Sequence, residues 1–534
     1  MKPLNNTLRC NENARKGAKS LGKSNTPSYV LELELDVNKK DVAILEKKMR
    51  IAKSIYNSCL GYALKRLASL RSDKEYRKLV KDKKAKGRMK RLKEIEQSHG
   101  YSEYQLHDFV KPIQAKYKKN IGSFEAQKLA SRAFHTVEKL KFRQAKHVHF
   151  KRPKDDMSVE NKSNDTGLRF DGEFFLWGEQ TQVSKKNPVS QPKKGALKLR
   201  VLIKPNDLYA QESLCDRTKY CRVMMREIRG IKRFFVQLVQ EGFPPVKRDK
   251  DTRLEKHPVD KLDKRVGIDI GPSTIATVSE EKVQLVELAE NCMMDAKELR
   301  HLERRMDRSK RASNPGNYKE DGTIKHGTRL SWNFSKRYMI LKAKRKDIYR
   351  KLVAKRKQAH ETLANDILFQ GSDVRVETMR FQSLQKKGKK TTRNKKNGRI
   401  NRKRRYGKSL LNHAPAMLIT ILDRKLGYQG KAVKKIDTYA TKASQFNHVT
   451  GDYTKKQLHE RWNDILGFPV QRDIYSAFLI GNTKDSLDTI DVGLCNTQWD
   501  DFLEQHNREI ARIQRSSSKT LYWFVKPDKT KWLA

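Results

Sequence analysis

The segment RVGIDIGPSTIATV, residues 265–278, constrains the fold of this chain more than any other stretch. An apolar run carries one acid, Asp269, between two glycines, then turns at Gly271-Pro272 and resumes as a second alternating run. This pattern predicts a β-hairpin with Asp269 at the end of its first strand. An unpaired carboxylate among Val and Ile is costly to bury, so it usually pairs with a cation, which in nucleic-acid enzymes is often a metal. The same pattern also fits a turn cap, and both interpretations are open at this point.

The charge of the chain narrows the choice of partner. Among its 534 residues, Lys and Arg number 118 and Asp and Glu number 62, so the formal net charge is +56. A chain of this length accommodates about two to four domains. Because the positive charge is spread along most of the chain, we expect a protein that envelops a polyanion, and nucleic acid is the predicted partner. No apolar run of about 18 residues is present, so no membrane partner is expected.

The N-terminus and the cysteines indicate the compartment. Residues 1–27 lack the apolar core of a secretory signal and are predicted to form a disordered basic tail. The six cysteines show no pairs at two-residue spacing, so a reducing compartment is the default. Cys215 and Cys221 have no second ligand pair nearby, which disfavours a zinc site.

The first half of the chain predicts a small β-barrel interrupted by helices. Alternating, strand-like patterns occur at residues 29–37, 167–177, 196–203 and 220–240. The last of these predicts a hairpin that turns at Arg229-Gly230. We expect the barrel to comprise residues 28–38 and 143–250, and a lobe of charged amphipathic helices to occupy residues 39–142. Such a barrel could grip nucleic acid or could be purely structural, and these residues favour neither interpretation.

The second half alternates helices and strands, as an α/β domain does. Residues 297–368 predict two helices, and the second is long and basic enough to bridge lobes and to lie along phosphates. The segment DVRVE, residues 373–377, is a β-branched strand that ends in Glu377; because it follows a helix, we expect a parallel strand reached by a crossover. A helix at residues 414–426 and a buried strand at residues 432–436 follow. Asp473 opens a further helix, where an aspartate taken alone is usually a cap.

A strongly basic loop follows Glu377. Residues 386–408 contain 13 Lys or Arg and no acid. This composition fits a loop that binds phosphate and also a solvated disordered segment, and the acidic neighbours at each end favour phosphate. The predicted nucleic-acid-binding residues are Lys386, Lys387, Lys389, Lys390, Arg393, Lys395, Lys396, Arg399, Arg402, Lys403, Arg404 and Arg405.

Three widely spaced acids, Asp269, Glu377 and Asp473, each stand at the end of a core element. A pair of divalent ions needs several convergent oxygens, and hydrolysis of a phosphodiester uses such a pair. Magnesium prefers oxygen ligands and accepts phosphate as a further ligand, so the predicted cofactor is two Mg²⁺ ions, with Mn²⁺ as a substitute.

A family resemblance ties these segments together. VGIDIGPSTIATVS, VRVETMRF and QRDIYSAFL, in this order, resemble the three parts of the split RuvC nuclease domain of TnpB, the transposon-encoded RNA-guided endonuclease related to type V CRISPR effectors. The resemblance implies an RNase H-like nuclease domain at residues 264–481, with bridging helices at 297–368 and Asp269, Glu377 and Asp473 as its metal-binding triad. It also implies that the barrel is a wedge, or OB-like, domain and that the helical lobe is a recognition lobe.

One segment departs from the family pattern. TnpB proteins usually carry cysteine pairs of a zinc ribbon before the third acid, but residues 439–471 contain no cysteine. His448 and His459 cannot supply four ligands, so we expect no structural zinc. This lid-like segment is predicted to fold on its own apolar side chains instead: Phe446, Tyr453, Leu458 and Trp462. Residues 482–534 form a C-terminal extension to which the sequence assigns no role.

The sequence therefore predicts a multidomain α/β protein with a β-barrel and a helical lobe. The predicted function is RNA-guided cleavage of DNA by a metal-dependent endodeoxyribonuclease that uses guide RNA and a double-stranded DNA target. The alternative is a guide-bound DNA-binding protein or repressor with little cleavage, which the missing ribbon favours and the intact triad disfavours. The expected location is the cytoplasm of a prokaryote, on the nucleoid when DNA is bound. The oligomeric state does not follow from the sequence.

Overall fold

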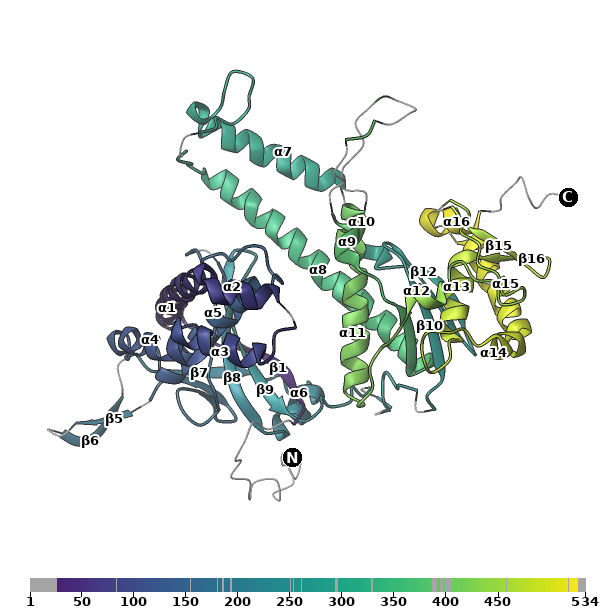
Figure 1. Cartoon of the computed structure of the whole chain (residues 1–534). Coiled ribbons are helices and arrows are strands. Elements are labelled where there is room, and N and C mark those ends of the chain that lie inside the picture. Colours follow the sequence, from purple (N-terminus) through teal and green to yellow (C-terminus); the bar gives the residue numbers. More distant parts are fainter. Residues whose placement is uncertain are drawn as a thin grey trace, which may run out of the picture. The chain divides into compact units, whose positions relative to one another are not determined.

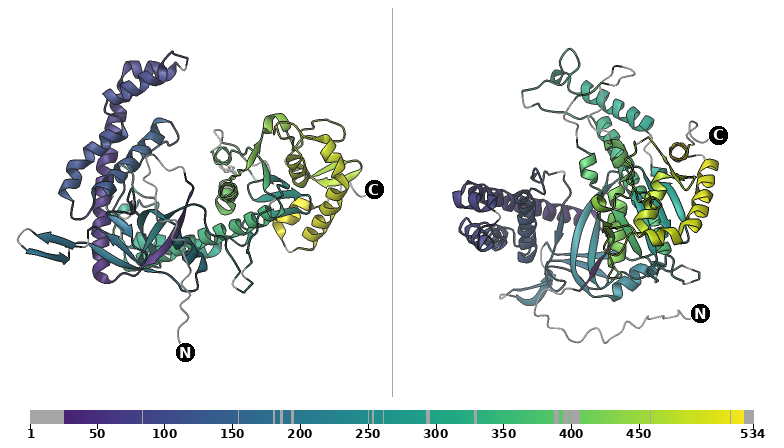
Figure 2. Two further views of the ribbon diagram at one scale, coloured as in Figure 1. Left: turned by 90° about the horizontal axis from the view of Figure 1, so that it is seen from below. Right: turned by 45° about the vertical axis from the view of Figure 1, so that its right-hand side comes forward.

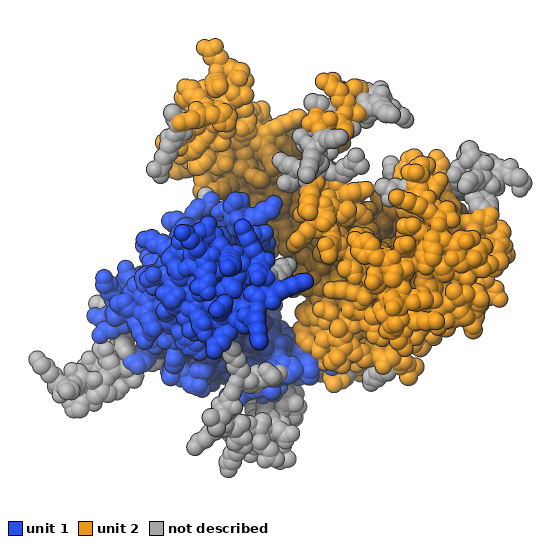
Figure 3. Space-filling view, viewed as in Figure 1, with its two compact units in different colours: residues 1–246 blue, residues 247–534 orange. Residues whose placement is uncertain are grey.

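The computed structural model describes residues 26–526, apart from residues 83, 154, 180, 185–186, 193–194, 250, 253, 261, 293–295, 328–329, 387–390, 394–397, 399–405, 458 and 517. The chain divides into two compact units, residues 1–246 and residues 247–534 (Figure 3). The predicted N-terminal tail falls almost wholly outside the described residues. Each unit is a mixed α/β structure with its own core.

Unit 1 is built on a seven-stranded antiparallel sheet in the order β2-β8-β9-β1-β7-β4-β3 (Figure 1). The edge strand β3 also contacts β8 near the opposite edge, so the sheet is curled. Its strands are β1 (Ser28–Leu35), β2 (Ser158–Glu160), β3 (Leu168–Phe170), β4 (Phe174–Trp177), β7 (Leu197–Leu202), β8 (Thr218–Ile228) and β9 (Ile231–Glu241). A separate ribbon, β5 (Thr181–Ser184) and β6 (Asn187–Pro192), was not expected.

The helical insertion between β1 and β2 packs on this sheet. Leu31, Leu33 and Leu35 alternate inward along β1 and share one core cluster with residues of α1 and α5. Figure 2 shows the ribbons of the helical insertion beside the strands of this sheet. The capping box formed by Asn38 and Asp41 starts α1. The helices are α1 (Lys39–Ser72), α2 (Lys74–Lys81), α3 (Arg88–Ser98), α4 (Glu103–Lys116) and α5 (Ser123–Lys141), and a short helix that the sequence did not predict, α6 (Leu208–Cys215), precedes β8.

The hairpin β8–β9 turns where the sequence predicted. Ile228 pairs with Ile231, and the two residues between them, Arg229 and Gly230, have φ of 53° and 81°. Two positive φ values in a two-residue turn match the twist of the flanking strands, and Gly adopts them without strain. The prediction of this hairpin is confirmed.

Unit 2 contains a five-stranded mixed sheet in the order β12-β11-β10-β13-β14. Strands β12, β11 and β10 are antiparallel neighbours, whereas β13 and β14 run parallel to β10. The predicted hairpin at the opening segment and the predicted parallel crossover strand are therefore confirmed. The strands are β10 (Arg265–Ile270), β11 (Thr274–Ser279), β12 (Val283–Glu287), β13 (Asp373–Glu377) and β14 (Lys434–Ile436).

Helices cover both faces of this sheet (Figure 1). On one face Val266, Ile268 and Ile270 pack with α8 and α11, and on the other α13 lies across β10 and β11. The helices between β12 and β14 are η2 (Glu290–Cys292), α7 (Ala296–Ala312), η3 (Pro315–Asn317), α8 (Lys336–Gln370), α9 (Phe381–Leu384), α10 (Gly407–His413) and α11 (Pro415–Gly427). After β14 come α12 (Thr438–Thr441), the hairpin β15 (Trp462–Ile465) and β16 (Phe468–Gln471), and α13 (Arg472–Gly481).

The C-terminal segment belongs to the core of unit 2. It forms α14 (Val492–Thr497), α15 (Trp499–Arg515) and α16 (Lys519–Val525), which pack on α13 and β12. Phe502 of α15 stacks on Phe478 of α13 with ring centroids 4.2 Å apart. The Glu509 carboxylate accepts a hydrogen bond of 2.7 Å from the Leu285 N–H of the edge strand β12. None of the described helices has an apolar stretch long enough to cross a membrane.

Candidate acidic site

Asp269 and Glu377 end two neighbouring parallel strands. Ile268 of β10 pairs with Val376 of β13. The next residue on each strand is an acid, so Asp269 and Glu377 lie side by side. Both side chains are only partly exposed. Because the two strands run in the same direction, both carboxylates lie at the same edge of the sheet.

Close packing of α13 on β10 brings the third acid to this edge. A Cβ atom on Gly267 would lie 2.0 Å from the Ala477 carbonyl oxygen and 2.4 Å from the Gly481 nitrogen, so only glycine permits this approach. Gly267 and Asp269 are two residues apart on a strand and share the face that α13 covers. Asp473 precedes Ala477 by four residues, about one helical turn or 6 Å, which matches the rise of two strand residues. Asp473 therefore faces Asp269.

The electrostatics of the three side chains show that they are close. Burial, then the Asp473 carboxylate and then that of Glu377 raise the pKa of Asp269 well above its ordinary value, and Arg472 and Arg461 oppose this effect. Burial also raises the pKa of Glu377. Neither Asp269 nor Glu377 forms a hydrogen bond or ion pair with another side chain in the described part of the chain. The described residues therefore stabilise the ionised forms of Asp269 and Glu377 only in part, and a cation at the site would favour them.

Asp473 is not the cap of its helix. The Gln471 side chain caps α13 by accepting a hydrogen bond of 2.8 Å from the Ile474 N–H, so the interpretation of Asp473 as a cap is wrong. Its carboxylate, 17% exposed, instead lies 3.3 Å from a guanidinium nitrogen of Arg461 and 3.1 Å from one of Arg472. The cap is Gln471, two residues before Asp473, because its side chain reaches a free N–H group of the first helical turn.

The hairpin β15–β16 positions both arginines. Trp462 pairs with Gln471, and the Arg472 N–H donates to the Arg461 carbonyl at 2.8 Å, so the two residues meet where the hairpin closes. The Arg461 guanidinium also lies over the Phe524 ring of α16, 4.3 Å from its centroid. Sequence reasoning missed both residues. The position of Arg472 next to Asp473 was a usable signal, whereas no local pattern marks Arg461.

A buried arginine secures the end of α13. Arg375, on β13 two residues before Glu377, has no exposed side-chain surface. Its guanidinium lies 2.8 Å from Asp373 and 2.9 Å from Asp485, and it donates to the Thr483 hydroxyl at 3.2 Å. Because Thr483 and Asp485 directly follow α13, Arg375 fixes that helix to the sheet. Its role was not predicted, since a short strand normally buries apolar residues.

The donor set suits a hard divalent cation, although the site is not a preassembled cage. Carboxylate oxygens are the ligands that magnesium prefers, and two of the three acids lack a cationic partner in contact. Among the described residues, no group of three or more His, Cys, Asp or Glu side chains is arranged to hold a metal ion. The third acid, Asp473, is instead in contact with the guanidinium groups of Arg461 and Arg472.

The basic loop lies mostly outside the described residues. Of the twelve predicted contacts only Lys386 and Arg393 are described, and both are exposed. The other ten are Lys387, Lys389, Lys390, Lys395, Lys396, Arg399, Arg402, Lys403, Arg404 and Arg405. The predicted contacts with nucleic acid stay predictions.

The lid-like segment folds partly as expected. The rings of Phe446 and Tyr453 lie 4.9 Å apart, and the Trp462 indole N–H donates to the Lys526 carbonyl at 3.0 Å; Leu458 lies outside the described residues. His448 is buried, with its Nδ1 2.7 Å from the Tyr475 hydroxyl, and His459 is exposed. The histidines thus lie in different environments, and the expectation of no structural zinc stays a prediction.

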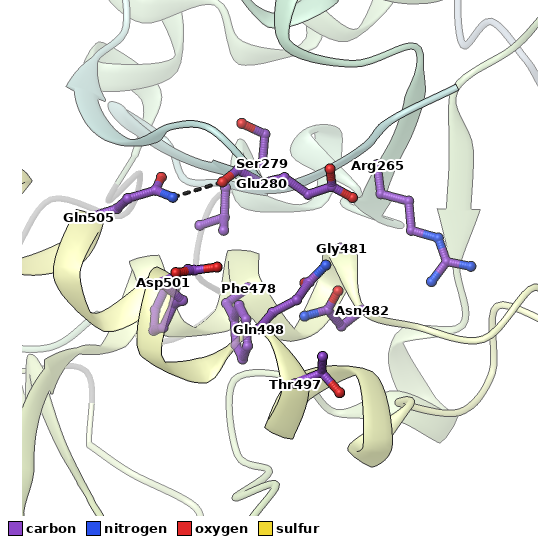
Figure 4. A pocket seen from close by; sticks show the side chains of 12 residues that line it. Arg265, Ser279, Glu280, Phe478, Gly481, Asn482, Thr497, Gln498, Asp501 and Gln505 are labelled. Atoms are coloured by element: carbon purple, nitrogen blue, oxygen red, sulfur yellow. Dashed lines mark hydrogen bonds between the residues drawn. The ribbon is translucent and has the colours of Figure 1, made fainter. Parts of the chain in front are cut away.

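A cavity of about 250 Å³ lies at the other end of β10 (Figure 4). Arg265, at the start of that strand, lines it together with Glu280, Phe478 and Asp501, and the Gln505 amide donates to the Glu280 carbonyl at 2.8 Å. None of the three acids lines this cavity. It is therefore separate from the acidic site, which lies at the ends of β10 and β13 where Asp269 and Glu377 stand.

Comparisons with known proteins give distant structural similarity. No family model matches the sequence, and no curated protein matches it. The chain is similar to a protein in the cryo-EM structure of a Cas12f1-sgRNA-target DNA complex, with 13% identity, a TM-score of 0.38, and coverage of 86% of this chain and 99% of that chain. It is also similar to a chain of a CRISPR-Cas12f ternary complex, with 14% identity, a TM-score of 0.26, and coverage of 84% and 83%. At such low identity and TM-scores, function has to be argued from the residues of this chain.

Proposed function

We propose that this protein is an RNA-guided DNA endonuclease of the TnpB and type V kind, with an RNase H-like nuclease domain in unit 2. The observation that carries the proposal is the convergence of Asp269, Glu377 and Asp473 at one edge of the mixed sheet, where each carboxylate is only partly exposed. Residues that perturb each other's pKa in this way occur preferentially at functional sites.

These three residues would hold magnesium. If bound by these residues, magnesium would supply activation of a water molecule and neutralisation of the leaving oxygen in phosphodiester hydrolysis. The half-buried carboxylates of Asp269 and Glu377 provide the negative charge that attracts the ions, and Gly267 and Arg375 keep α13 in place so that Asp473 faces them. Arg461 and Arg472 hold the Asp473 carboxylate, and their guanidinium groups can also bind phosphate oxygens of a nucleic-acid strand.

The proposed partners are guide RNA and a double-stranded DNA target; the Cas12f1 complex to which this chain is similar contains an sgRNA and target DNA. The net charge of +56 suits a protein that encloses nucleic acid. In this proposal the curled sheet of unit 1 is the wedge domain, its helices are the recognition lobe, and base pairing with the guide selects the target. A prokaryotic cytoplasmic location belongs to the same proposal.

A second function is favoured by one observation. Asp473 is engaged by two guanidinium groups, and the described residues form no preassembled metal cage. This arrangement would suit a guide-bound DNA-binding protein with little cleavage. It requires that Arg461 and Arg472 stay on Asp473 when DNA is bound.

Reconstitution with the natural RNA separates the two functions. The protein is purified with its co-expressed RNA, the RNA is sequenced, and the complex is incubated with Mg²⁺ and a matching double-stranded target. We expect cleavage by the wild type and none by Asp269→Asn, which keeps the shape of the side chain and removes its charge. The exposed carboxylate of Asp500 provides the matched control, Asp500→Asn, which should cut normally.

Guided binding without cutting by the wild type would establish the second function instead. In that case the double variant Arg461→Gln, Arg472→Gln tests the cause, since release of Asp473 should restore some cleavage. Cleavage by Asp269→Asn at the wild-type rate would contradict the assignment of the site.

A further inference from the structure

Unit 1 contains a cavity of about 300 Å³ to which the sequence assigned no role. It lies where the start of α5 meets α1 and the strands β3 and β4, and the buried side chains of Lys48, Glu125 and Trp177 line it. Ligand cavities in proteins begin at about this volume, so the space is sufficient for a group of the size of one nucleobase with part of its sugar. The cavity lies wholly within unit 1, apart from the acidic site.

Glu125 has one oxygen occupied and one unoccupied. The side chain is 1% exposed. Its Oε2 accepts hydrogen bonds from the Gly122 N–H at 2.8 Å and from the Trp177 indole N–H at 3.1 Å. Its Oε1 accepts no hydrogen bond from any described residue. Oε2 alone therefore accepts the hydrogen bonds that cap α5 and hold Trp177. This structural role does not involve Oε1.

Two glycines keep the space beside Oε1 open. A Cβ atom on Gly122 would lie 3.3 Å from Oε1, and one on Gly167 would lie 3.1 Å from it. Gly167 also has a φ of +69°, which other residues rarely adopt. Oε1 is not among the fully buried side-chain atoms without a partner, so it is reachable from the cavity, where a donor from a ligand would form the hydrogen bond that the described residues do not supply.

Lys48 supplies a hydrogen-bond donor to the cavity, whereas Glu125 supplies an acceptor. The side chain is 2% exposed, and its Nζ donates to the Asn120 carbonyl at 2.9 Å and lies 4.9 Å from the Trp177 ring centroid. An ammonium group has three donors, so others remain for a ligand acceptor. Burial lowers the pKa of Lys48 to about 8 and raises that of Glu125, and the attraction between their opposite charges counteracts both shifts only in part.

The rim of the cavity is basic and aromatic. Lys118 and Lys119 are exposed there, and Arg169 is partly exposed. Phe124 is 42% exposed and carries the Lys162 ammonium 5.4 Å from its centroid. Cations next to an exposed ring are the combination that binds phosphate and stacks a base in single-stranded nucleic acid.

We propose that this cavity binds one unstacked nucleotide of a single strand. The base donates a hydrogen bond to Glu125 Oε1 and accepts one from Lys48. The protein therefore recognises an edge of the base that has a hydrogen-bond donor next to an acceptor. Phe124 stacks on the base or its sugar, and Lys118 and Lys119 contact the phosphate. This site is additional to the proposed nuclease site and does not depend on it.

The test measures the binding of mononucleotides to the full-length protein after nucleic acid has been removed at high salt. AMP, CMP, GMP, UMP and inorganic phosphate are titrated separately by calorimetry. We expect at least one nucleotide to bind with a Kd about tenfold or more below that of phosphate, and Glu125→Gln to weaken its binding about tenfold because a donor replaces the acceptor. Glu94→Gln, at an exposed glutamate of α3, is the control and should bind as the wild type does.

Two results would overturn the proposal: phosphate binding as tightly as every nucleotide, or Glu125→Gln binding the nucleotides unchanged. If Glu125→Gln loses its fold by circular dichroism, Phe124→Ala at the exposed rim replaces it. A loss of about fivefold or more in nucleotide affinity then supports the site, and an unchanged affinity overturns it. DNA cleavage is not measured, so failure here is distinct from failure of the proposed nuclease.

Discussion

At the scale of single residues, Gly267 decides where a carboxylate can lie. It stands two residues before Asp269 on the same face of β10, and the backbone of α13 occupies the space that a side chain would fill. The contact sets the distance between strand and helix and places Asp473 over Asp269. A residue without a side chain is thus as important for the site as the acids.

Substitution of Gly267 by alanine should destabilise unit 2 and misplace Asp473. The added Cβ would lie 2.0 Å from the Ala477 carbonyl, and because this neighbour is backbone it cannot move aside cheaply. We expect the free energy of unfolding, measured with urea, to fall by about 2 kcal/mol or more. Gly316→Ala is the matched control, because its added Cβ meets nothing within 4 Å. Equal stability of the two variants would contradict the packing argument.

His506 should make the stability of unit 2 sensitive to acid. It is buried, its Nε2 accepts from the Gln471 N–H at 3.0 Å, and burial lowers its pKa from 6.5 to about 4. Between these pH values the unfolded chain takes up a proton that the folded chain does not, so the free energy of unfolding decreases as the pH falls below 6.5. We expect a loss of about 2 kcal/mol between pH 7 and pH 5 from this group.

Urea unfolding of the wild type and His506→Gln at both pH values checks this expectation. Glutamine can accept the same hydrogen bond but does not titrate, so the variant should lose less stability on acidification. An identical pH dependence in both proteins would show that other groups cause it.

At the scale of elements, the C-terminal helices complete the core of unit 2. The buried faces of α14 to α16 share one apolar cluster with α13 and β12, and α16 places Phe524 under Arg461. The hairpin β15–β16 delivers Arg461 and Arg472 to Asp473. The C-terminal helices, to which the sequence assigned no role, therefore support the segment that contains Arg461, Arg472 and Asp473.

Truncation of the Phe502 side chain should show how much α15 contributes to the free energy of unfolding. Its ring is 3% exposed and stacks on Phe478, so Phe502→Ala should lower the free energy of unfolding by about 3 kcal/mol or more. Trp523→Ala on α16 removes a ring that is 68% exposed and should change it by less than about 0.5 kcal/mol. Similar values for both in urea unfolding would contradict the view that α15 is part of the core.

At the scale of the whole molecule, charge dominates the chemistry of the surface. The excess of 118 basic over 62 acidic residues leaves the chain with a net charge of +56, which is spread along most of its length. Binding of a polyanion would release counterions and would compensate this repulsion. We therefore expect the affinity of the protein for nucleic acid to depend steeply on salt.

Replacement of the twelve predicted basic contacts between Lys386 and Arg405 by glutamine should weaken nucleic-acid binding and flatten its salt dependence. Each lost phosphate contact with duplex DNA should reduce the slope of log K against log salt by about 0.9. Filter binding at several salt concentrations measures this slope for the wild type and the variant. An unchanged slope would show that the loop does not touch phosphate.

Local sequence was sufficient for many of the elements and marked the acids as candidates. Alternation marked β1 and the hairpin β8–β9, a polar turn marked Arg229-Gly230, and an acid at the end of an apolar strand marked Asp269 and Glu377. These signals are local, because strand periodicity and turn chemistry involve residues near each other in the chain.

The tertiary structure alone decided how these parts meet. The approach of α13 to Gly267, the two guanidinium groups on Asp473, the buried Arg375 and the free oxygen of Glu125 all depend on contacts between residues far apart in sequence. Such contacts follow from packing and burial, which leave no periodic pattern in the chain. Asp473 is the clearest case: its sequence context indicates a helix cap, and only the folded chain turns its carboxylate toward Arg461, Arg472 and Asp269.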